Sequence, residues 1–108
     1  MSVPEFNMIP INEFLTLSAT ALDIKILREW QHAPDASFVA YVLEHHREFD
    51  YQHLRGALRI LQNVDSQDVR ELFKYYAKHS EPGFRALAIG SLNEQQKRGW
   101  CKEPAGVH

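Results

Sequence analysis

The fold is decided by the stretch DASFVAYVLEHHREFDYQHLRGALRILQNVDSQDVRELFKYYAKHS, residues 35–80, in which helix-capping residues recur at a constant interval. Asp, Ser and Thr are favoured at the N-cap position because their side-chain oxygens accept hydrogen bonds from the first backbone amides of a helix. Five such residues stand 15 residues apart along the chain: Thr20, Asp35, Asp50, Asp65 and Ser80. This series predicts five helix starts.

Apolar residues follow each predicted cap with the spacing of a helix. Four residues after the caps come Ile24, Val39, Leu54, Val69 and Phe84. Further apolar residues stand seven or eight positions after each cap, so that they fall on one helix face. Each unit therefore predicts a helix of about 11 to 12 residues, roughly 17 Å long, followed by a short turn. Turns this short force successive helices to run antiparallel.

The sequence thus predicts an all-α fold of five to six short antiparallel helices, stacked as helix hairpins in an α-solenoid-like arrangement with about 15 residues per helix unit. A compact bundle of five or six helices with accidental regularity is the alternative. We expect helices near Thr20–Gln31, Ala36–Arg47, Tyr51–Gln62, Ser66–Lys78 and Glu81–Asn93, with a shorter one at Asn12–Ser18.

A hydrophobic-Arg-x-x-small pattern recurs between Asp35 and Asn93. It reads FRALAI at 84–89, with similar sequences at 54–58 (LRGAL) and 69–70 (VR). In these features the chain resembles a short helical-repeat protein of the HEAT-like type, although a double unit of 30 residues is shorter than the standard repeat periods. The resemblance implies a scaffold that binds other macromolecules.

Length and composition predict a single domain over residues 1–108. Within it we expect an extended N-terminal arm at 1–10, a helical repeat core at 11–94 and a C-terminal tail at 95–108. Prolines at 4 and 10 oppose a helix in the arm, whose apolar residues need cover. The arm either caps its own core or docks on a second chain. Gly99, Pro104 and Gly106 are typical of a non-helical tail.

Charge and cysteine content restrict the location and the partners. A net charge of −2 and a pI near 6.3 argue against a general nucleic-acid or membrane coat. The single cysteine, Cys101, excludes an internal disulfide and fits a cytoplasmic protein. No Lys or Arg occurs in the first 24 residues, so a secretory signal is not expected. No stretch approaches the ~20 apolar residues of a membrane span.

No catalytic or metal-binding motif is present in the sequence. His45, His46 and His53 cluster with Glu44 and Asp50, but they lack the spacing of a zinc site. Phosphate-binding glycine loops and nucleophile elbows are also absent. We therefore expect no catalytic residue, no metal and no cofactor, and the chain is interpreted as a protein without enzymatic activity. An enzyme whose site is assembled from distant residues is the alternative.

Basic residues give the strongest functional signal. Lys25, Arg55 and Arg85 occupy the same position after their caps on alternate helices, and Arg59 lies one turn after Arg55. They predict a basic stripe that contacts an acidic protein surface; a solvated helix face is the structural alternative. Tyr41 and Tyr51 both lie off the main apolar stripe, where a tyrosine either contacts a partner or packs at the rim of the core. Tyr51 and Phe6, an apolar residue of the N-terminal arm, complete the predicted partner-binding set.

These observations favour a protein-interaction module that acts as an adaptor, assembly factor, chaperone-like partner or inhibitor. Two exposed ends of a short stack are also compatible with a homodimer. Nucleic-acid or phosphate binding through the stripe is the first alternative, and it predicts an affinity that falls steeply with salt.

Overall fold

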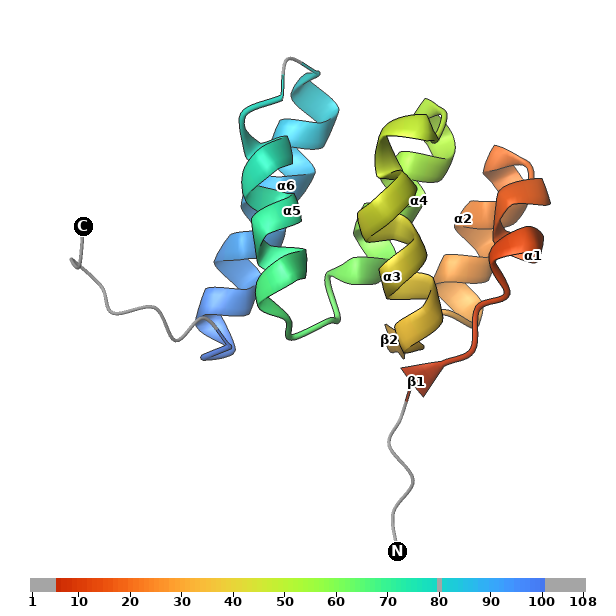
Figure 1. Ribbon diagram of the computed structural model, residues 1–108, viewed down its shortest axis with the longest axis horizontal. Coiled ribbons are helices and arrows are strands. Elements are labelled where there is room, and N and C mark those ends of the chain that lie inside the picture. Colours follow the sequence, from red (N-terminus) through yellow and green to blue (C-terminus); the bar gives the residue numbers. More distant parts are fainter. Residues whose placement is uncertain (1–5, 80, 101–108) are drawn as a thin grey trace, which may run out of the picture. The chain divides into compact units, whose positions relative to one another are not determined.

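The structure is a computed structural model that describes residues 6–79 and 81–100. Six α-helices and two very short strands account for most of these residues (Figure 1), which confirms the all-α class. In chain order the elements are β1 (Phe6–Asn7), α1 (Ile11–Thr16), α2 (Ala19–Arg28), β2 (Ala33–Pro34), α3 (Ala36–His45), a 3₁₀ turn (His46–Glu48), α4 (Tyr51–Leu61), α5 (Gln67–Ala77) and α6 (Pro82–Lys97).

The chain divides into two compact units, Met1–Val64 and Asp65–His108. The first unit contains α1 to α4 with both strands, and the second contains α5 and α6. Each unit is described by itself. The expectation of one domain over 1–108 stays a prediction, as does the solenoid arrangement.

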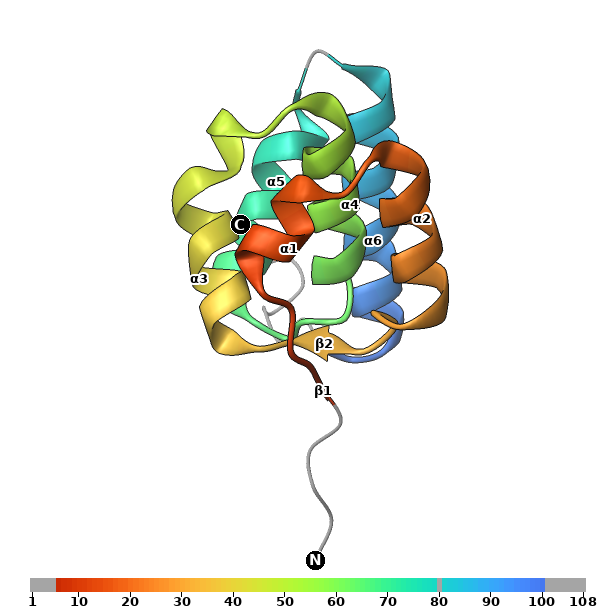
Figure 2. The ribbon, with the colours of Figure 1, turned by 90° about the vertical axis from the view of Figure 1, so that its right-hand side faces the viewer.

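The first unit is built around the aromatic ring of Phe14, which is fully buried. Although α1 has only six residues, it lies across the unit between α3 and α2, with α4 behind it (Figure 2). The Phe14 ring meets Phe38 of α3 edge to face, with centroids 5.2 Å apart, and lies 6.4 Å from Trp30. Edge-to-face pairs of this kind stabilise a core beyond the area that they bury. Phe14 therefore fixes the short α1 against α3.

The two strands hold the residues before α1 against the same unit. Phe6 and Asn7 pair in parallel with Ala33 and Pro34. The Asn7 side chain also accepts a hydrogen bond from the His32 backbone N–H at 2.9 Å. In the described part of the predicted arm, the backbone is thus extended and lies beside β2, and Ile9 is buried.

The second unit is a helical hairpin in which α6 presents one buried stripe to α5. Phe84, Ala88, Ser91 and Gln95 form this stripe, with the spacing of one helix face. Tyr76 of α5 meets Phe84 edge to face at 5.6 Å. The helix continues to Lys97, so the predicted end at Asn93 is wrong, as is a tail from residue 95. No Gly or Pro interrupts 91–98, and Gly99 with φ 76° ends the helix.

The observed N-cap residues differ in part from the series predicted at an interval of 15 residues. Asp35 and Asp50 cap α3 and α4 as predicted, their carboxylates accepting from the Phe38 and His53 amides. Thr20 and Asp65 are wrong as caps, because Ser18 caps α2 and Ser66 caps α5. Ser80 lies outside the described residues, and Glu81 caps α6. The spacing is therefore not a constant 15, and helix lengths run from 6 to 16 residues.

The Asp65 correction has a clear physical reason. Ser66 and Asp65 are adjacent, and both are good capping residues. The Ser66 hydroxyl accepts from the Val69 amide at 3.4 Å, whereas the Asp65 carboxylate lies 2.8 Å from the Arg70 guanidinium. Arg70 is 9% exposed, and a buried cation needs a paired anion. The Asp65 carboxylate thus pairs with Arg70, and the neighbouring Ser66 caps α5 in its place.

Candidate functional site

Lys25, the first residue of the predicted basic stripe, lies between two carboxylates. Its ammonium group is 2.9 Å from Glu29 and 3.2 Å from Glu13. The hydrogen bond to Glu29, and after it the one to Glu13, raises the pKa of Lys25 above its ordinary value. The ammonium also stands 5.5 Å from the centroid of the Trp30 ring. Through Glu13, Lys25 therefore links α2 to α1, and through Glu29 it pairs with the C-cap residue of α2.

The arginines of the stripe also contact groups of their own unit. Arg55 and Arg59 of α4 both approach Asp23 of α2, at 3.8 and 3.0 Å. In the second unit, Arg85 donates to the carbonyl oxygen of His79 at 3.0 Å. The structure thus brings Arg55 and Arg59 together at one carboxylate, and each predicted cation has a partner in the fold.

The two remaining predicted contact residues belong to the first unit. Tyr51 opens α4 and is 45% exposed. Phe6 lies in β1, where its backbone pairs with Ala33.

In the histidine cluster, His45 and His53 each contact a nearby carboxylate. His45 lies 2.9 Å from Glu48, and His46 is buried. The His53 ring reaches Asp50 through Nδ1 at 2.8 Å and the Leu17 carbonyl oxygen through Nε2 at 3.0 Å. Over residues 6–79 and 81–100, no three metal-ligating side chains come together. His53 therefore joins the start of α4 to the end of α1.

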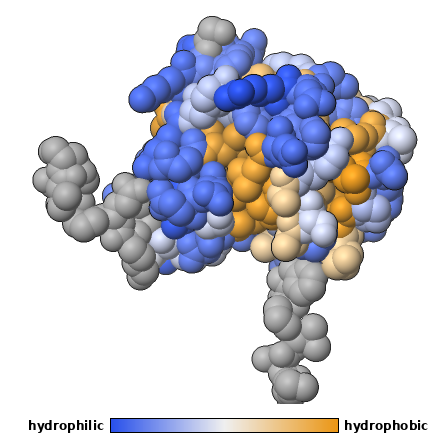
Figure 3. Space-filling view, viewed as in Figure 1, coloured by the Kyte–Doolittle hydropathy of each residue, from blue (hydrophilic) through white to orange (hydrophobic). Residues whose placement is uncertain are grey.

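A groove runs between α1 and α3 on the surface of the first unit, and we call it the α1–α3 groove. One hollow, of about 450 Å³, is lined by Met8, Ile9, Pro10, Ile11, Asp35, Ser37, Phe38 and Tyr41. A second, of about 220 Å³, is lined by Leu15, Tyr41, His45, Glu48, Phe49, Asp50 and His53. Tyr41 borders both hollows, so they are neighbours along α3. Figure 3 shows hydrophobic surface in the part where Figure 1 draws α1 and α3.

The groove follows from the shortness of α1. Because Phe14 is the one buried residue of this six-residue helix, Ile11 and Leu15 on its flanks stay half-buried. The chain before α1 forms the other wall, where Ile9 is buried but Met8 is 69% exposed. A side chain as apolar as Met8 at this exposure, next to an apolar hollow, is typical of a contact surface.

The two ends of the groove differ in charge. The Met8 end is mainly apolar, and its one carboxylate, Asp35, is engaged in capping α3. At the other end, the carboxylates of Glu48 and Asp50 have side chains that are 71% and 65% exposed. The backbone N–H of His53, followed by its ring, holds the pKa of Asp50 below its ordinary value. Asp50 is therefore ionised at neutral pH.

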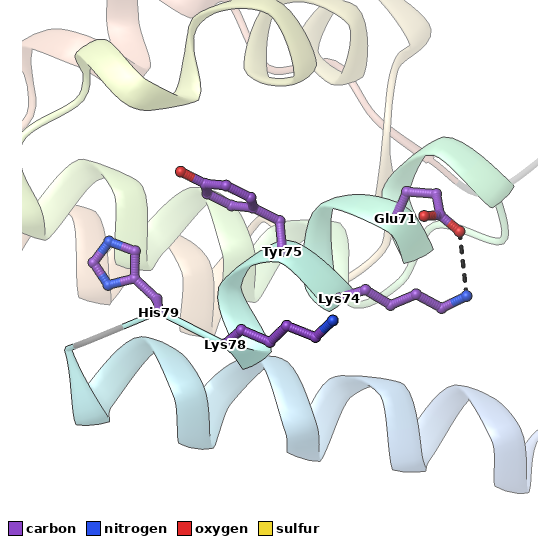
Figure 4. Close-up of a pocket in the computed structure, with 5 residues that line it drawn as sticks. All are labelled: Glu71, Lys74, Tyr75, Lys78 and His79. Atoms are coloured by element: carbon purple, nitrogen blue, oxygen red, sulfur yellow. Dashed lines mark hydrogen bonds and ion pairs between the residues drawn. The ribbon is translucent and has the colours of Figure 1, made fainter.

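A third hollow, of about 610 Å³, lies along α5 in the second unit and is drawn in Figure 4. Its lining comprises Glu71, Lys74, Tyr75, Lys78 and His79. The Lys74 ammonium contacts Glu71 at 3.2 Å, and both lysine side chains run along the helix, whereas the Tyr75 and His79 rings point elsewhere (Figure 4). These groups do not converge on one point, so the α1–α3 groove is the better candidate site.

Sequence reasoning missed most of this groove. Met8 carries a usable signal, because an apolar residue in a segment bounded by prolines is either covered or available for contact. Tyr41 carries another, since it lies off the main apolar stripe of its helix. Nothing in the sequence places Met8 beside Tyr41, because that proximity depends on how α1 packs on α3.

Comparison with known proteins gives one partial similarity. No family model and no solved structure matches the chain. An acylphosphatase-like protein of Methanocaldococcus jannaschii is 32% identical over 57 residues. The match covers 53% of this chain and 37% of that relative, so the chain spans little more than a third of the relative's length.

Among the described residues, no helix has both the length and the hydropathy that a membrane crossing requires.

Proposed function

We propose that this chain is a non-enzymatic protein-interaction module, of the adaptor, assembly-factor, chaperone-like or inhibitor type, and that it binds its partner through the α1–α3 groove. The single observation that carries the proposal is the groove itself, whose larger hollow is mainly apolar, with Met8 exposed at its edge. Helix grooves of this kind receive apolar segments of other proteins. A cytoplasmic location stays a prediction.

The groove replaces the basic stripe as the first candidate surface. Lys25, Arg55 and Arg59 already have carboxylate partners, so a protein partner would have to compete with Glu29 and Asp23 for them. Exposed ion pairs of this type contribute little to affinity, whereas burial of apolar surface supplies most of the favourable energy in association. Tyr51, at the start of α4, stays a predicted contact residue.

Site-specific photo-crosslinking in cells tests the proposal. A photoreactive phenylalanine derivative is placed at Met8 in the groove, at Arg55 in the stripe, or at exposed Asn93 of α6 as a control. We expect a discrete adduct from the Met8 position and none from Asn93. The crosslinked protein is then purified, and its binding to wild type and to Met8→Glu is compared by calorimetry. Binding that is at least about tenfold weaker in Met8→Glu supports the groove.

Three other outcomes are informative. An adduct from Arg55 alone would restore the basic stripe as the surface. An adduct with a second copy of this chain would identify a homodimer. Absence of any protein adduct at all positions would make the interaction proposal wrong.

An enzymatic function is the second candidate, favoured by the partial similarity to an acylphosphatase-like protein. Hydrolysis of an acyl phosphate requires cationic groups that converge on the phosphoryl oxygens. The purified full chain is assayed for hydrolysis of acetyl phosphate, and the Lys74→Ala/Lys78→Ala variant serves as the matched control for the basic hollow on α5. Turnover that the double variant abolishes would favour the enzyme, and turnover at the uncatalysed rate would reject this reaction.

Nucleic-acid or phosphate binding through the stripe stays the remaining prediction. It is checked by titration of a fluorescent oligonucleotide at two salt concentrations. Affinity that falls steeply with added salt would support it.

A further inference from the structure

Resting on the proposed function, we infer that the Glu48 end of the α1–α3 groove is a pocket for one Lys or Arg side chain, so that the partner is an apolar segment with a single basic anchor. The pocket is the hollow of about 220 Å³ next to Tyr41. Its walls, its charge and its place beside the apolar hollow each support this assignment.

The walls of the pocket are aromatic. The rings of Tyr41 and Phe49 are nearly parallel, at 21°, with centroids 6.2 Å apart. Neither ring is fully buried, so both present apolar surface to the hollow. Aromatic faces attract ammonium and guanidinium groups, and their edges cover the methylene stem of a long side chain. Leu15 of α1 adds apolar lining.

The charge of the pocket is complementary to a cation. Glu48 and Asp50 line it together with His45 and His53, and within the described residues no Lys or Arg does. Glu48 contacts His45 through Oε2 at 2.9 Å, which engages one of its two oxygens. Asp50 is held ionised by its contacts with His53, so a carboxylate is present at neutral pH. Both Asp50 oxygens contact His53, so the second oxygen of Glu48 is the acceptor that these contacts leave for a cation. A charge-assisted hydrogen bond to this oxygen is stronger than a neutral one.

The distance between the two hollows sets the spacing in the partner. Tyr41 lines both hollows, and the nearest α3 residues that line only one of them are Phe38 in the apolar hollow and His45 in the pocket. These two residues are seven positions apart, which is about 10 Å of helix. An extended partner segment covers this distance in about three residues. A helical one covers it in about seven. The basic anchor should therefore lie three or seven positions from the main apolar anchor.

Peptide display on the full chain tests the inference. Random dodecamer peptides are selected against the wild-type protein and sequenced, and selected peptides are synthesised with Arg or with its neutral isostere citrulline. We expect selected peptides to carry Lys or Arg at one of the two spacings. Citrulline should weaken binding about tenfold, because it keeps the shape and removes the charge-assisted contact.

Two protein variants locate the anchor. Glu48→Gln should weaken the Arg peptide about as much as citrulline does, and it should leave the citrulline peptide unchanged. Glu44→Gln is the matched control, because Glu44 lies at the end of α3, four residues before Glu48, but does not line the pocket. It should change the affinity less than about twofold. Far-ultraviolet circular dichroism checks that both variants fold.

The outcomes separate the inference from the proposed function. Peptides that lose affinity in Met8→Glu but show no basic residue, or no effect of citrulline, would overturn the basic anchor and leave protein binding in the groove intact. Failure to enrich any peptide over an unrelated protein would overturn the anchor as well, and the crosslinking experiment then decides whether another surface binds a protein.

Discussion

The Asp35 carboxylate joins the Ile9 backbone to the start of α3. Its Oδ1 accepts the Ile9 N–H at 2.9 Å, and its Oδ2 accepts the Phe38 N–H at 3.3 Å. One side chain thus caps a helix and holds a segment that lies 26 residues earlier in the chain. Since Ile9 and Phe38 both line the α1–α3 groove, Asp35 fixes the width of its apolar end.

Asp35→Ala should therefore cost more than the loss of an ordinary cap. We expect the free energy of unfolding to fall by about 2 kcal/mol, from one cap and one further hydrogen bond. Ser18→Ala is the control, because Ser18 caps α2 through Ala21 and it should cost about 1 kcal/mol. Urea titration measures both values. Hydrogen exchange at the Ile9 amide should accelerate in Asp35→Ala only, and unchanged exchange there would contradict the double role.

Gly56 and Gly90 should respond in opposite ways to substitution by Ala. A Cβ at Gly56 would lie 2.7 Å from Leu22 Cδ2, where α4 approaches α2, and Leu22 is 1% exposed. We expect Gly56→Ala to destabilise the protein by about 1–3 kcal/mol. Gly90 of α6 has nothing within 4 Å of that position, so Gly90→Ala should stabilise it by about 0.5–1 kcal/mol. Thermal unfolding compares the two, and stabilisation by both would mean that the Leu22 contact is relieved without cost.

The helices themselves could be predicted from local chemistry, because capping and apolar spacing act within a few residues. Asp35 and Asp50 cap helices as their sequence context predicts. Errors arose where neighbouring residues compete for one task. Ser66, and not Asp65, caps α5, because the Asp65 carboxylate pairs with the buried Arg70. The burial of Arg70 depends on tertiary packing.

The groove could not be predicted in the same way, because its contacts are non-local. The Ile9–Asp35 and His53–Leu17 hydrogen bonds join residues 26 and 36 positions apart. The predicted basic residues illustrate the same limit. Spacing placed Arg59 on a basic stripe, but it carries no information on Asp23, which stands 3.0 Å away on another helix. A stripe of charges in sequence was therefore an incomplete guide to the surface.

Stability should fall as the pH is lowered from 7 to 5, with His46 as one cause. His46 is 8% exposed, and burial, followed by the charge of Arg47, holds its pKa below the ordinary 6.5. The unfolded chain therefore takes up the proton at a higher pH than the folded chain, which favours unfolding as the pH falls. Asp50, with its lowered pKa, adds a further loss only when the pH falls below about 4.

Urea titrations at a series of pH values measure this dependence. His46→Gln should have a shallower decline between pH 7 and 5 than the wild type. His32→Gln, at an exposed position, is the control and should keep the wild-type decline. Equal slopes in wild type and His46→Gln would show that other groups cause the pH dependence.

Phe14 should contribute far more to the free energy of unfolding than its place in a six-residue helix indicates. Its ring is fully buried and meets Phe38, Trp30, Phe49 and His53. We expect Phe14→Ala to lower the free energy of unfolding by about 3–5 kcal/mol. Leu27→Ala on α2 is the matched control, because Leu27 is 62% exposed, and it should change stability by less than about 0.5 kcal/mol.

Tryptophan fluorescence in urea measures the Phe14 effect directly. Trp30 lies 6.4 Å from Phe14, so in a Trp100→Phe background its emission reports on the first unit. The same variant should also lose binding in the α1–α3 groove, since α1 forms one wall of both hollows. If Phe14→Ala unfolded at nearly the wild-type urea concentration, α1 would be held by the His53 and Asp35 hydrogen bonds more than by its aromatic anchor.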